Sequence, residues 1–524
     1  MKAGSIHPTK RTTSTIPRGG RPVKARAPHL PRSLNENLSR KSPSASISPD
    51  YGGGLDSLSG TPYARRVHSG LKQSEAARSV TGSGRGANPP SLSWLAVIGG
   101  IALLVRLAYI LSMDRLGWAG PPTPDSFHFM SLARALLAGR GFAPDAVNAT
   151  DAAFRPPLYV FFLSGVFGLF GDSELAVRVI QALLGAGSAL LVAAMAARIF
   201  GRKAAWLAGL LVAFHPHLVL QSGWILSESL FTFLYLAALF FFVQTIGYGG
   251  QPGFATSSTA GRDGRWPRAA PALAGLSLGL SILCRPTPML AIPILAIAIF
   301  LIHRKSPRPA LARAAVFGAC CVLVVAPWII RGRVLYHAWI PVSTNGEFTL
   351  YLGNSPGWAE RVYGNHEVGY GQDWDRAPYQ LIKEHPPGWF TQQALHVIAQ
   401  DPRRFARFCV VRAGEQFKIL PEARGSVPRR LLAFWSYTIL FPIGMIGLLV
   451  ALRRRDPMAW TLLVLAAALS LVHIVSIPDI RYRAPLIDAL LPIYSGGLLA
   501  APIARLARRA RRRIFGGRIS PEAG

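Results

Sequence analysis

Charged residues are scarce in this chain of 524 residues: they make up 16% of it, against 50% hydrophobic residues. A soluble protein of this size needs far more charge to cover its apolar surface, whereas a lipid bilayer removes that need. The composition therefore argues against an ordinary soluble enzyme and favours a protein that crosses a membrane several times.

Acidic residues are particularly few, with 25 Asp and Glu against 57 Lys and Arg. Much of the basic excess lies in two tails: residues 1–90 hold 15 Lys/Arg and 4 Asp/Glu, and residues 501–524 hold 7 Arg and 1 Glu. The rest falls in short clusters between apolar runs, which is a pattern of membrane topology and not of a nucleic-acid groove. We expect no nucleic-acid partner, and membrane lipids as the partners of the basic tails.

Cysteine is also rare, with four residues that form neither a Cys-x-x-Cys pair nor a Cys/His pair with zinc spacing: Cys284, Cys320, Cys321 and Cys409. The sequence therefore predicts no disulfide framework and no zinc site, and the cysteines are interpreted as packing residues.

Residues 1–90 are rich in Ser, Gly, Pro and Arg and lack a periodic apolar pattern, which predicts a disordered cytoplasmic tail. The first apolar run, 94–113, is long enough to span a bilayer and predicts an uncleaved signal anchor. It is followed by nine further candidate spans, at 175–197, 204–222, 228–247, 271–284, 287–303, 310–330, 431–452, 457–477 and 484–504. The run 156–170 is shorter and predicts an interfacial or re-entrant helix.

Basic clusters follow the second, fourth, sixth and eighth spans, and this count places all of them on the same side as both tails. The positive-inside rule makes that side cytoplasmic and leaves two long extracytoplasmic segments, 114–174 and 331–430. The predicted fold is an all-α polytopic protein of the inner (plasma) membrane with about 10 transmembrane helices. Its expected parts are a transmembrane module at 91–330, the external segment 331–430, the C-terminal helices at 431–504 and a basic cytoplasmic tail at 505–524.

The first functional signal is a set of arginines at or near the external ends of the predicted spans, where the positive-inside rule predicts few positive charges. An arginine near a membrane tends to be functional unless its side chain extends to the water interface. For each arginine taken alone, a side chain that only extends to the interface stays an open alternative. Together they suggest an external rim that binds an anion such as a lipid phosphate. They are Arg106, Arg155, Arg178, Arg285, Arg331, Arg333, Arg481 and Arg483.

Two acidic residues lie among these arginines. Asp125 opens an amphipathic stretch in the first external segment, where it is either the N-cap of a helix or a functional carboxylate. Glu228 lies between two spans at the external interface, where it either pairs with an arginine or contacts a ligand or metal. His215 and His217 are two residues apart, so they point to different faces of a helix and do not suggest a metal pair.

These residues carry a resemblance to the membrane-embedded glycosyltransferases of the GT-C fold, closest to the branch with protein O-mannosyltransferases and the bacterial lipid A aminoarabinose and galacturonic acid transferases. The matching motifs cover roughly residues 94–500. They are Asp125 with Phe129 and Ala133; Phe154-Arg155-Pro156-Pro157-Leu158; Phe170-Gly171 through Arg178; Glu228; Gly275 to Gly279 before Arg285-Pro286; Pro327-Trp328 with Arg331; and Arg481-Tyr482-Arg483-Ala484-Pro485.

The resemblance implies an inverting transfer of a sugar from a polyprenyl-phosphate donor to a hydroxyl of a lipid, glycan or protein on the extracytoplasmic face. It implies Asp125 as the catalytic base. Arg155, Arg285, Arg481 and Arg483 are the implied ligands of the donor phosphate, and Glu228 and Tyr482 position the substrates. The resemblance assigns no cofactor and leaves a divalent metal open. Many relatives carry a second acid beside the first-loop Asp, and Ser126 stands there in this chain.

A secondary transporter or lipid flippase is the alternative. That class predicts internal repeats, ionisable residues near the middle of the membrane and interrupted helices paired between two halves. The sequence shows none of these clearly, because its charged residues gather at the external ends of the predicted spans.

Overall fold

The computed structural model describes residues 93–113, 115, 123–247, 265–355, 377–417 and 434–515. All of them belong to one compact unit, Ala87–Gly524. The expected tail at 1–90 lies outside the described residues, as do parts of the two segments expected to be external and the end of the C-terminal tail.

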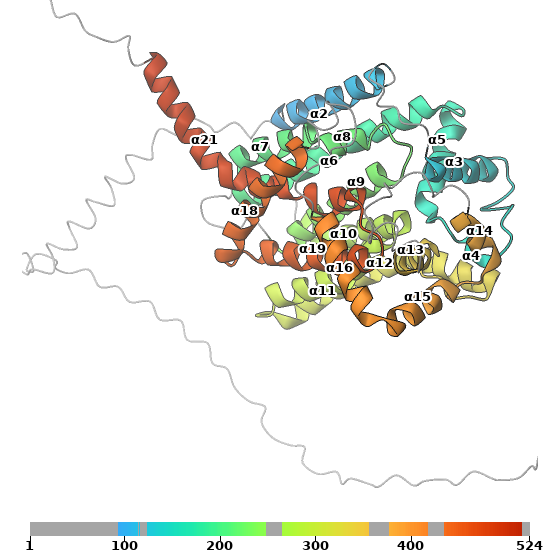
Figure 1. Cartoon of the computed structure of the whole chain (residues 1–524). Helices are drawn as coiled ribbons and strands as arrows, with labels where there is room; N and C mark the ends of the chain where they lie inside the picture. The colour runs from blue at the N-terminus through green and yellow to red at the C-terminus, as the bar shows by residue number, and fades with distance from the viewer. Residues whose placement is uncertain are drawn as a thin grey trace, which may run out of the picture. The chain divides into compact units, whose positions relative to one another are not determined.

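Helices are the regular elements throughout the described ranges, which contain no strand (Figure 1). This confirms the all-α membrane fold. The N-terminal half comprises α2 (Ser93–Ser112), α3 (Pro124–Leu137), α4 (Ala149–Ala152), α5 (Pro157–Phe170), α6 (Glu174–Phe200), α7 (Arg202–Ala213), α8 (Pro216–Leu220) and α9 (Glu228–Thr245). It continues with α10 (Arg265–Cys284), the 3-10 turn η1 (Thr287–Leu290), α11 (Ala291–Ile302) and α12 (Pro307–Tyr336).

The C-terminal half begins with four helices that follow α12: α13 (Asn345–Asn354), α14 (Ala377–Glu384), α15 (Trp389–Gln400) and α16 (Pro402–Gln416). A π-helical turn, η3 (Trp435–Leu440), leads into α18 (Phe441–Arg453), and α19 (Pro457–Val475) follows. The chain then forms α20 (Ile480–Arg483), a second π-helical turn, η4 (Ala484–Asp488), and α21 (Leu491–Phe515).

Five described helices are long and apolar enough to cross a membrane: α2, α6, α9, α12 and α19. A sixth candidate is the bent pair Arg481–Asp488 and Leu491–Leu506, whose parts meet at 48°. Each of the six coincides with an expected span. The segments 157–170, 268–284, 287–302 and 438–453 form shorter apolar helices, so the number of about ten spans is reached only if such short helices also cross.

The expected span at 204–222 is wrong as a continuous helix. α7 ends at Ala213, and α8 begins only at Pro216. Proline disfavours the helical conformation in the residue before it, and His215 is accordingly extended (φ −68°, ψ 113°). The helix is therefore interrupted in the middle of this apolar run.

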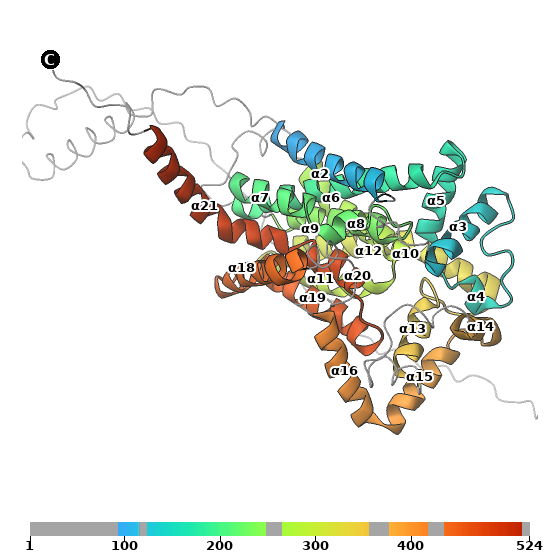
Figure 2. The same ribbon diagram turned by 45° about the horizontal axis from the view of Figure 1, so that its top comes forward.

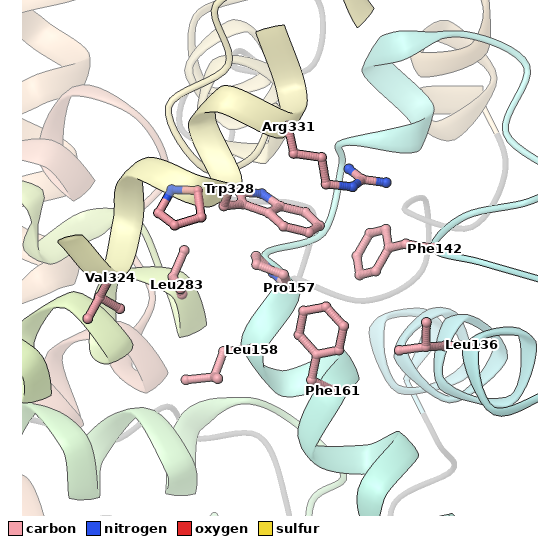
Figure 3. Close-up of a pocket in the computed structure, with 10 residues that line it drawn as sticks. Leu136, Phe142, Pro157, Leu158, Phe161, Leu283, Val324, Trp328 and Arg331 are labelled. Carbon is pink, nitrogen blue, oxygen red and sulfur yellow. The ribbon is translucent and has the colours of Figure 1, made fainter. Parts of the chain in front are cut away.

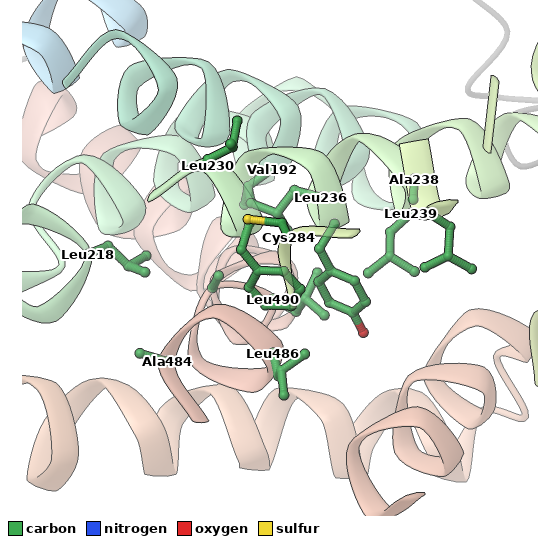
Figure 4. Packing of buried hydrophobic residues seen from close by; sticks show 14 of the residues in the cluster. Val192, Leu218, Leu230, Leu236, Ala238, Leu239, Cys284, Ala484, Leu486 and Leu490 are labelled. Carbon is green, nitrogen blue, oxygen red and sulfur yellow. The ribbon is translucent and has the colours of Figure 1, made fainter. Parts of the chain in front are cut away.

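α10 packs closely against both α9 and α12. Gly275 and Gly279 allow the approach to α12: a Cβ added at Gly279 would lie 2.7 Å from Cβ of Val324, and one at Gly275 would meet the carbonyl oxygen of Phe317. Small residues four apart permit this kind of close contact between membrane helices. Cys284, at the end of α10, lies among leucines of α9 and η4 (Figure 4). It is a free thiol, as are the other three cysteines.

Arg106 does not belong to an external rim, because its side chain is fully buried in α2. Its guanidinium donates to the carbonyl oxygens of Ala213 (3.3 Å) and Val212 (3.4 Å) at the end of α7. A helix C-terminus carries carbonyl groups without helical partners, and a cation there is stabilising. Arg106 thus caps the broken α7 from a neighbouring helix, next to Gly185, where any side chain would collide with it.

The two segments expected to be external contact each other. α4 packs on α14, α13 on α15 and α15 on α16 (Figure 2). The Asn148 amide donates to the carbonyl oxygens of Ile382, Lys383 and His385, and the Thr150 hydroxyl also donates to His385. These bonds cap the C-terminus of α14 and fasten it to the first segment.

Candidate active site

Asp125 lies in the first turn of α3. Thr123 is the N-cap, because its hydroxyl accepts from the backbone N–H of Ser126 (3.2 Å), and Pro124 follows at the first helical position. Asp125 is therefore not the N-cap, and that interpretation is wrong. Its carboxylate accepts from Arg155 Nη2 at 2.6 Å and lies 3.5 Å from Arg481 Nη2. The Asp125 side chain is 24% exposed, so the carboxylate is ion-paired but still reachable.

Arg155 occupies the extended turn between α4 and α5 that Pro156 and Pro157 impose. Its guanidinium lies 5.0 Å from the ring centre of Phe129 and 4.9 Å from that of Phe154. Its Nε donates to Nδ1 of His128 at 3.2 Å. Two rings, a carboxylate and an imidazole thus fix the guanidinium in one orientation, which suits bidentate anion binding.

His128 is a site residue that the sequence analysis did not find. Burial, reinforced by Arg155, lowers the pKa of His128 to about 3. The ring is therefore neutral at pH 7, and its Nδ1 can accept from Arg155. His128 lies three residues after Asp125 on the same face of α3, so this spacing was the signal that could have identified it.

Arg481 and Tyr482 come from α20, the short helix after α19. Arg481 lies 3.3 Å from the carboxylate of Asp479, and its Nη2 donates to the Tyr482 hydroxyl at 3.2 Å. Asp479 was not identified from the sequence. Because Arg481 also reaches Asp125, this turn connects the last part of the chain to the first segment after α2.

Glu228 and Arg285 form a second ion pair, with Glu228 Oε1 3.3 Å from Arg285 Nη2. Glu228 is 2% exposed and begins α9, and Arg285 directly follows α10. The Arg285 guanidinium lies 5.0 Å from the ring centre of Tyr482, and that of Arg481 lies 5.1 Å from it. Tyr482 therefore lies against both arginines and connects the two ion pairs. Of the two alternatives for Glu228, the pairing with an arginine is present.

Tyr482 also stacks on His473 of α19, with ring centres 4.7 Å apart. No motif drew attention to His473. The structure thus brings together six of the seven residues singled out for the site: Asp125, Arg155, Glu228, Arg285, Arg481 and Tyr482.

Arg483, the seventh, points elsewhere. It is fully buried, lies 3.0 Å from Asp488 and donates to the carbonyl oxygen of Gln416 at 3.0 Å. Residues two apart on a helix point to different sides, so Arg481 faces Asp125 while Arg483 faces α16. Arg483 anchors the segment that presents Arg481 and Tyr482.

An apolar cavity of about 500 Å³ lies beside the site. Its walls come from α3, α5, α10 and α12, and Arg331 lies at its edge (Figure 3). Two wall residues are close to site residues in the sequence: Pro157 lies two positions after Arg155, and Leu283 two positions before Arg285. The site therefore combines a charged part with an adjoining apolar part.

In the described part of the chain, no three or more His, Cys, Asp or Glu side chains are arranged so that they could hold a metal ion. His215 and His217 flank the break before α8, where both are buried. The arrangement around Asp125 instead provides guanidinium groups for an anion and a carboxylate for a proton.

Comparison with known proteins shows which fold this is. The family described as dolichyl-phosphate-mannose-protein mannosyltransferase matches residues 154–330. The oligosaccharyltransferase AglB from Archaeoglobus fulgidus, in complex with an inhibitory peptide and a dolichol-phosphate, superposes with a TM-score of 0.52 at 18% identity. The match covers 82% of this chain and 52% of AglB. This is the GT-C fold.

Two other solved structures are also similar, to different degrees. The apo form of the Archaeoglobus fulgidus enzyme matches with a TM-score of 0.52 and 19% identity, over 82% of this chain and 52% of that one. ArnT from Cupriavidus metallidurans, bound to undecaprenyl phosphate, matches at 15% identity over 82% of each chain, with a TM-score of 0.37. No curated protein matches this chain. The GT-C protein described here spans about half the length of the oligosaccharyltransferase.

Proposed function

We propose that this protein is a membrane glycosyltransferase that moves a sugar from a polyprenyl-phosphate donor to an acceptor hydroxyl. The observation that carries the proposal is the single site formed by Asp125, Arg155, Arg481, Tyr482, Arg285 and Glu228. The family match over 154–330 and the shared fold with an oligosaccharyltransferase that binds dolichol-phosphate support it.

The donor phosphate binds to Arg155, Arg481 and Arg285 in this proposal. In the structure each of these arginines is paired with an acid, Arg155 and Arg481 with Asp125 and Arg285 with Glu228. An incoming phosphate competes for the same donors, and a guanidinium binds a phosphate bidentately as well as it binds a carboxylate. Donor binding would therefore release Asp125 from its ion pairs and leave its carboxylate able to accept a proton.

Transfer then needs one proton acceptor and charge neutralisation at the leaving group. Asp125 takes the proton of the acceptor hydroxyl, whose oxygen forms a bond with the anomeric carbon from the face opposite the phosphate. The bond between that carbon and the phosphate oxygen breaks, and its electron pair leaves with the lipid phosphate. Arg155, Arg481 and Arg285 stabilise the negative charge on this product. Glu228 and Tyr482 position the substrates, and the configuration of the sugar inverts.

The site opens to the extracytoplasmic face of the inner (plasma) membrane, and both termini lie in the cytoplasm, in the same proposal. The basic clusters between the apolar runs support this orientation. The acceptor is a hydroxyl of a lipid, glycan or protein. The transporter alternative is not favoured, because the fold is shared with a transferase and the ionisable residues of the site lie at helix ends.

The variant Asp125→Asn tests the proposal. Purified protein is incubated with a panel of polyprenyl-phosphate sugars and acceptors, and release of free lipid phosphate is measured. Loss of the proton acceptor should lower the rate by about 10²–10⁴-fold. Asp145→Asn is the matched control, since that side chain lies in the same segment and is 84% exposed. A folded Asp125→Asn protein with full transfer activity would falsify the assignment of the base.

A further inference from the structure

The N-terminal end of α13 is bonded to α4 and to the turn after it, which carries the first arginine of the site. The Thr344 hydroxyl donates to the carbonyl oxygen of Thr150 at 2.7 Å, and the Thr344 backbone N–H donates to that of Ala153 at 3.0 Å. One helical turn later, the ring of Phe348 packs edge-on against the ring of Phe154, with centres 5.6 Å apart. Thr344 and Phe348 are both buried. The start of α13 therefore fixes the residues directly before that arginine.

The C-terminal end of α13 is bonded to the end of α19, ahead of the segment that carries Arg481. The buried Asn354 amide donates to the carbonyl oxygen of Val475 at 3.0 Å. The two backbones approach so closely that a Cβ added at Gly353 would collide with the carbonyl oxygen of Ser476. Since α19 ends at Val475 and Arg481 follows six residues later, the end of α13 fixes the beginning of that segment.

Arg412 of α16 strengthens this second contact. Its side chain is fully buried. Its guanidinium donates to the carbonyl oxygens of Ile474 at 3.3 Å and Val475 at 3.0 Å, at the end of α19. It also donates to the carbonyl oxygen of Gly353 and, at 3.2 Å, to the side-chain oxygen of Asn354, at the end of α13. The last carbonyl groups of a helix lack helical partners, and a cation there is stabilising. One guanidinium therefore caps two helices and holds their ends together.

α13 thus connects the two segments whose arginines meet at Asp125. Arg155 Nη2 lies 2.6 Å from one oxygen of this carboxylate, and Arg481 Nη2 lies 3.5 Å from the other. Figures 1 and 2 both show α13 between α4 and α16. A helix of 10 residues is about 15 Å long, and its backbone bonds make it stiff. The carboxylate is therefore not the only group that keeps the two arginines facing each other.

We propose that α13, held by Thr344 at its start and by Arg412 at its end, is a brace that sets the distance between Arg155 and Arg481. The inference rests on the proposed function, in which a donor phosphate displaces Asp125 from both arginines. At that stage the carboxylate no longer holds them, and the brace keeps them spaced for the phosphate. Arg412 acts through the backbone ahead of Arg481 and contacts no substrate, so it is a positioning residue and not a catalytic residue.

Amide hydrogen exchange of the purified full chain tests the brace without turnover. In Arg412→Gln, exchange should rise at least about tenfold in the peptides that cover 350–355 and 474–483, because their charged cap is lost, while α2 and α6 should keep the parent rates. Asn354→Ala, which removes the amide contact and no charge, should raise exchange in the same two places. Arg407→Gln is the matched control, since Arg407 is an exposed arginine of the same helix, and its exchange should equal that of the parent.

Transfer kinetics then test whether Arg412 acts through Arg481. Arg412→Gln should lower kcat/KM for the lipid donor about tenfold, and Arg412→Lys, which keeps a cation at the helix ends, should recover most of the loss. In the background of Arg481→Gln, adding Arg412→Gln should cost no further activity, because the residue that it positions is already absent. A residue with only a general role in stability would instead lower the rate by the same factor in both backgrounds.

Two results would overturn the inference. One is parent-like exchange of 474–483 in both Arg412→Gln and Asn354→Ala. The other is a loss of activity in Arg412→Gln that multiplies with the loss in Arg481→Gln. A failure of the proposed function is seen separately, because a parent protein that transfers no sugar refutes that function, while the exchange measurement still decides whether the brace holds the two segments.

Discussion

The buried pair of Arg483 and Asp488 allows a quantitative test of how the site is held. Arg483 Nε lies 3.0 Å from Asp488 Oδ1, and the guanidinium is also 4.5 Å from the ring centre of Phe441. Arg483 and Asp488 are 0% and 3% exposed. They are five residues apart, and the π-helical turn between them, closed by the bond from Ala489 N–H to the carbonyl oxygen of Ala484 (2.9 Å), brings residues at this spacing together.

Replacing Arg483 alone by Met leaves the Asp488 carboxylate buried beside an apolar side chain. Breaking a buried ion pair in this way destabilises a protein by about 3–5 kcal/mol, because one charge stays uncompensated. Replacing both partners, in Arg483→Met with Asp488→Leu, removes both charges and should restore most of the lost stability. The asymmetry between the single and the double variant is the expected signature.

The free energy of unfolding of the purified protein in detergent, from denaturant titration, measures this asymmetry. Arg453→Met serves as the control, since Arg453 is an exposed arginine at the end of α18. If Arg483→Met is no less stable than Arg453→Met, the pair does not hold the segment 480–488. If the double variant is as unstable as the single one, an uncompensated charge is not the cause of the loss.

Two more predictions concern the pH response and helix packing. The pKa of His128 is about 3 in the folded protein and near 6.5 in an unfolded chain. Its contribution to the free energy of unfolding is therefore complete above pH 6.5 and is lost as the pH falls toward 3. By pH 5 the free energy of unfolding should have fallen by about 2 kcal/mol. A titration of stability should show a flatter profile between pH 6.5 and 5 for His128→Asn, and an unchanged profile would contradict the assignment. Gly279→Ala should destabilise the protein by about 1–3 kcal/mol, since the new Cβ would lie 2.7 Å from Cβ of Val324. Gly318→Ala is the control, because the space around Gly318 is open and the variant should not be destabilised. Equal melting temperatures of the two variants would refute the close packing of α10 on α12.

Long apolar runs predicted the fold well, because a bilayer makes length and apolarity nearly sufficient criteria. The runs at 94–113, 175–197, 228–247, 310–330 and 457–477 all correspond to helices of spanning length. The run at 204–222 satisfied the same criteria and is nevertheless broken at His215 and Pro216. Pro216 was a visible signal of this interruption, but the prediction followed the average hydrophobicity of the whole run instead.

The candidate site was predictable where the residues lie at helix ends that the topology places on one side of the membrane. Asp125, Arg155 and Arg481 lie at helix ends that a topological count brings to one side, and the structure joins them. Arg106 and Arg483 had the same signal, but their side chains bond to other parts of the fold. The difference lies in their partners. Arg106 donates to the carbonyl oxygens of Val212 and Ala213, and Arg483 pairs with Asp488 and donates to the carbonyl oxygen of Gln416; the folded backbone brings these acceptors into place, and no sequence pattern shows them.

The cap that Arg106 provides for α7 bears on how the chain is assembled during synthesis. Its acceptor on Ala213 lies 107 residues further along the chain. At about 5–20 residues per second, ribosomes need roughly 5–20 s to make that stretch. Until then α2 carries a cation whose inter-helix acceptors do not exist. An arginine at the centre of an inserted helix costs about 2.5–3.5 kcal/mol, and this is an upper bound for Arg106, which lies toward the end of α2. Synthesis of α2 therefore precedes its stabilisation, and the two helices become interdependent only after α7 has been made and packs against α2.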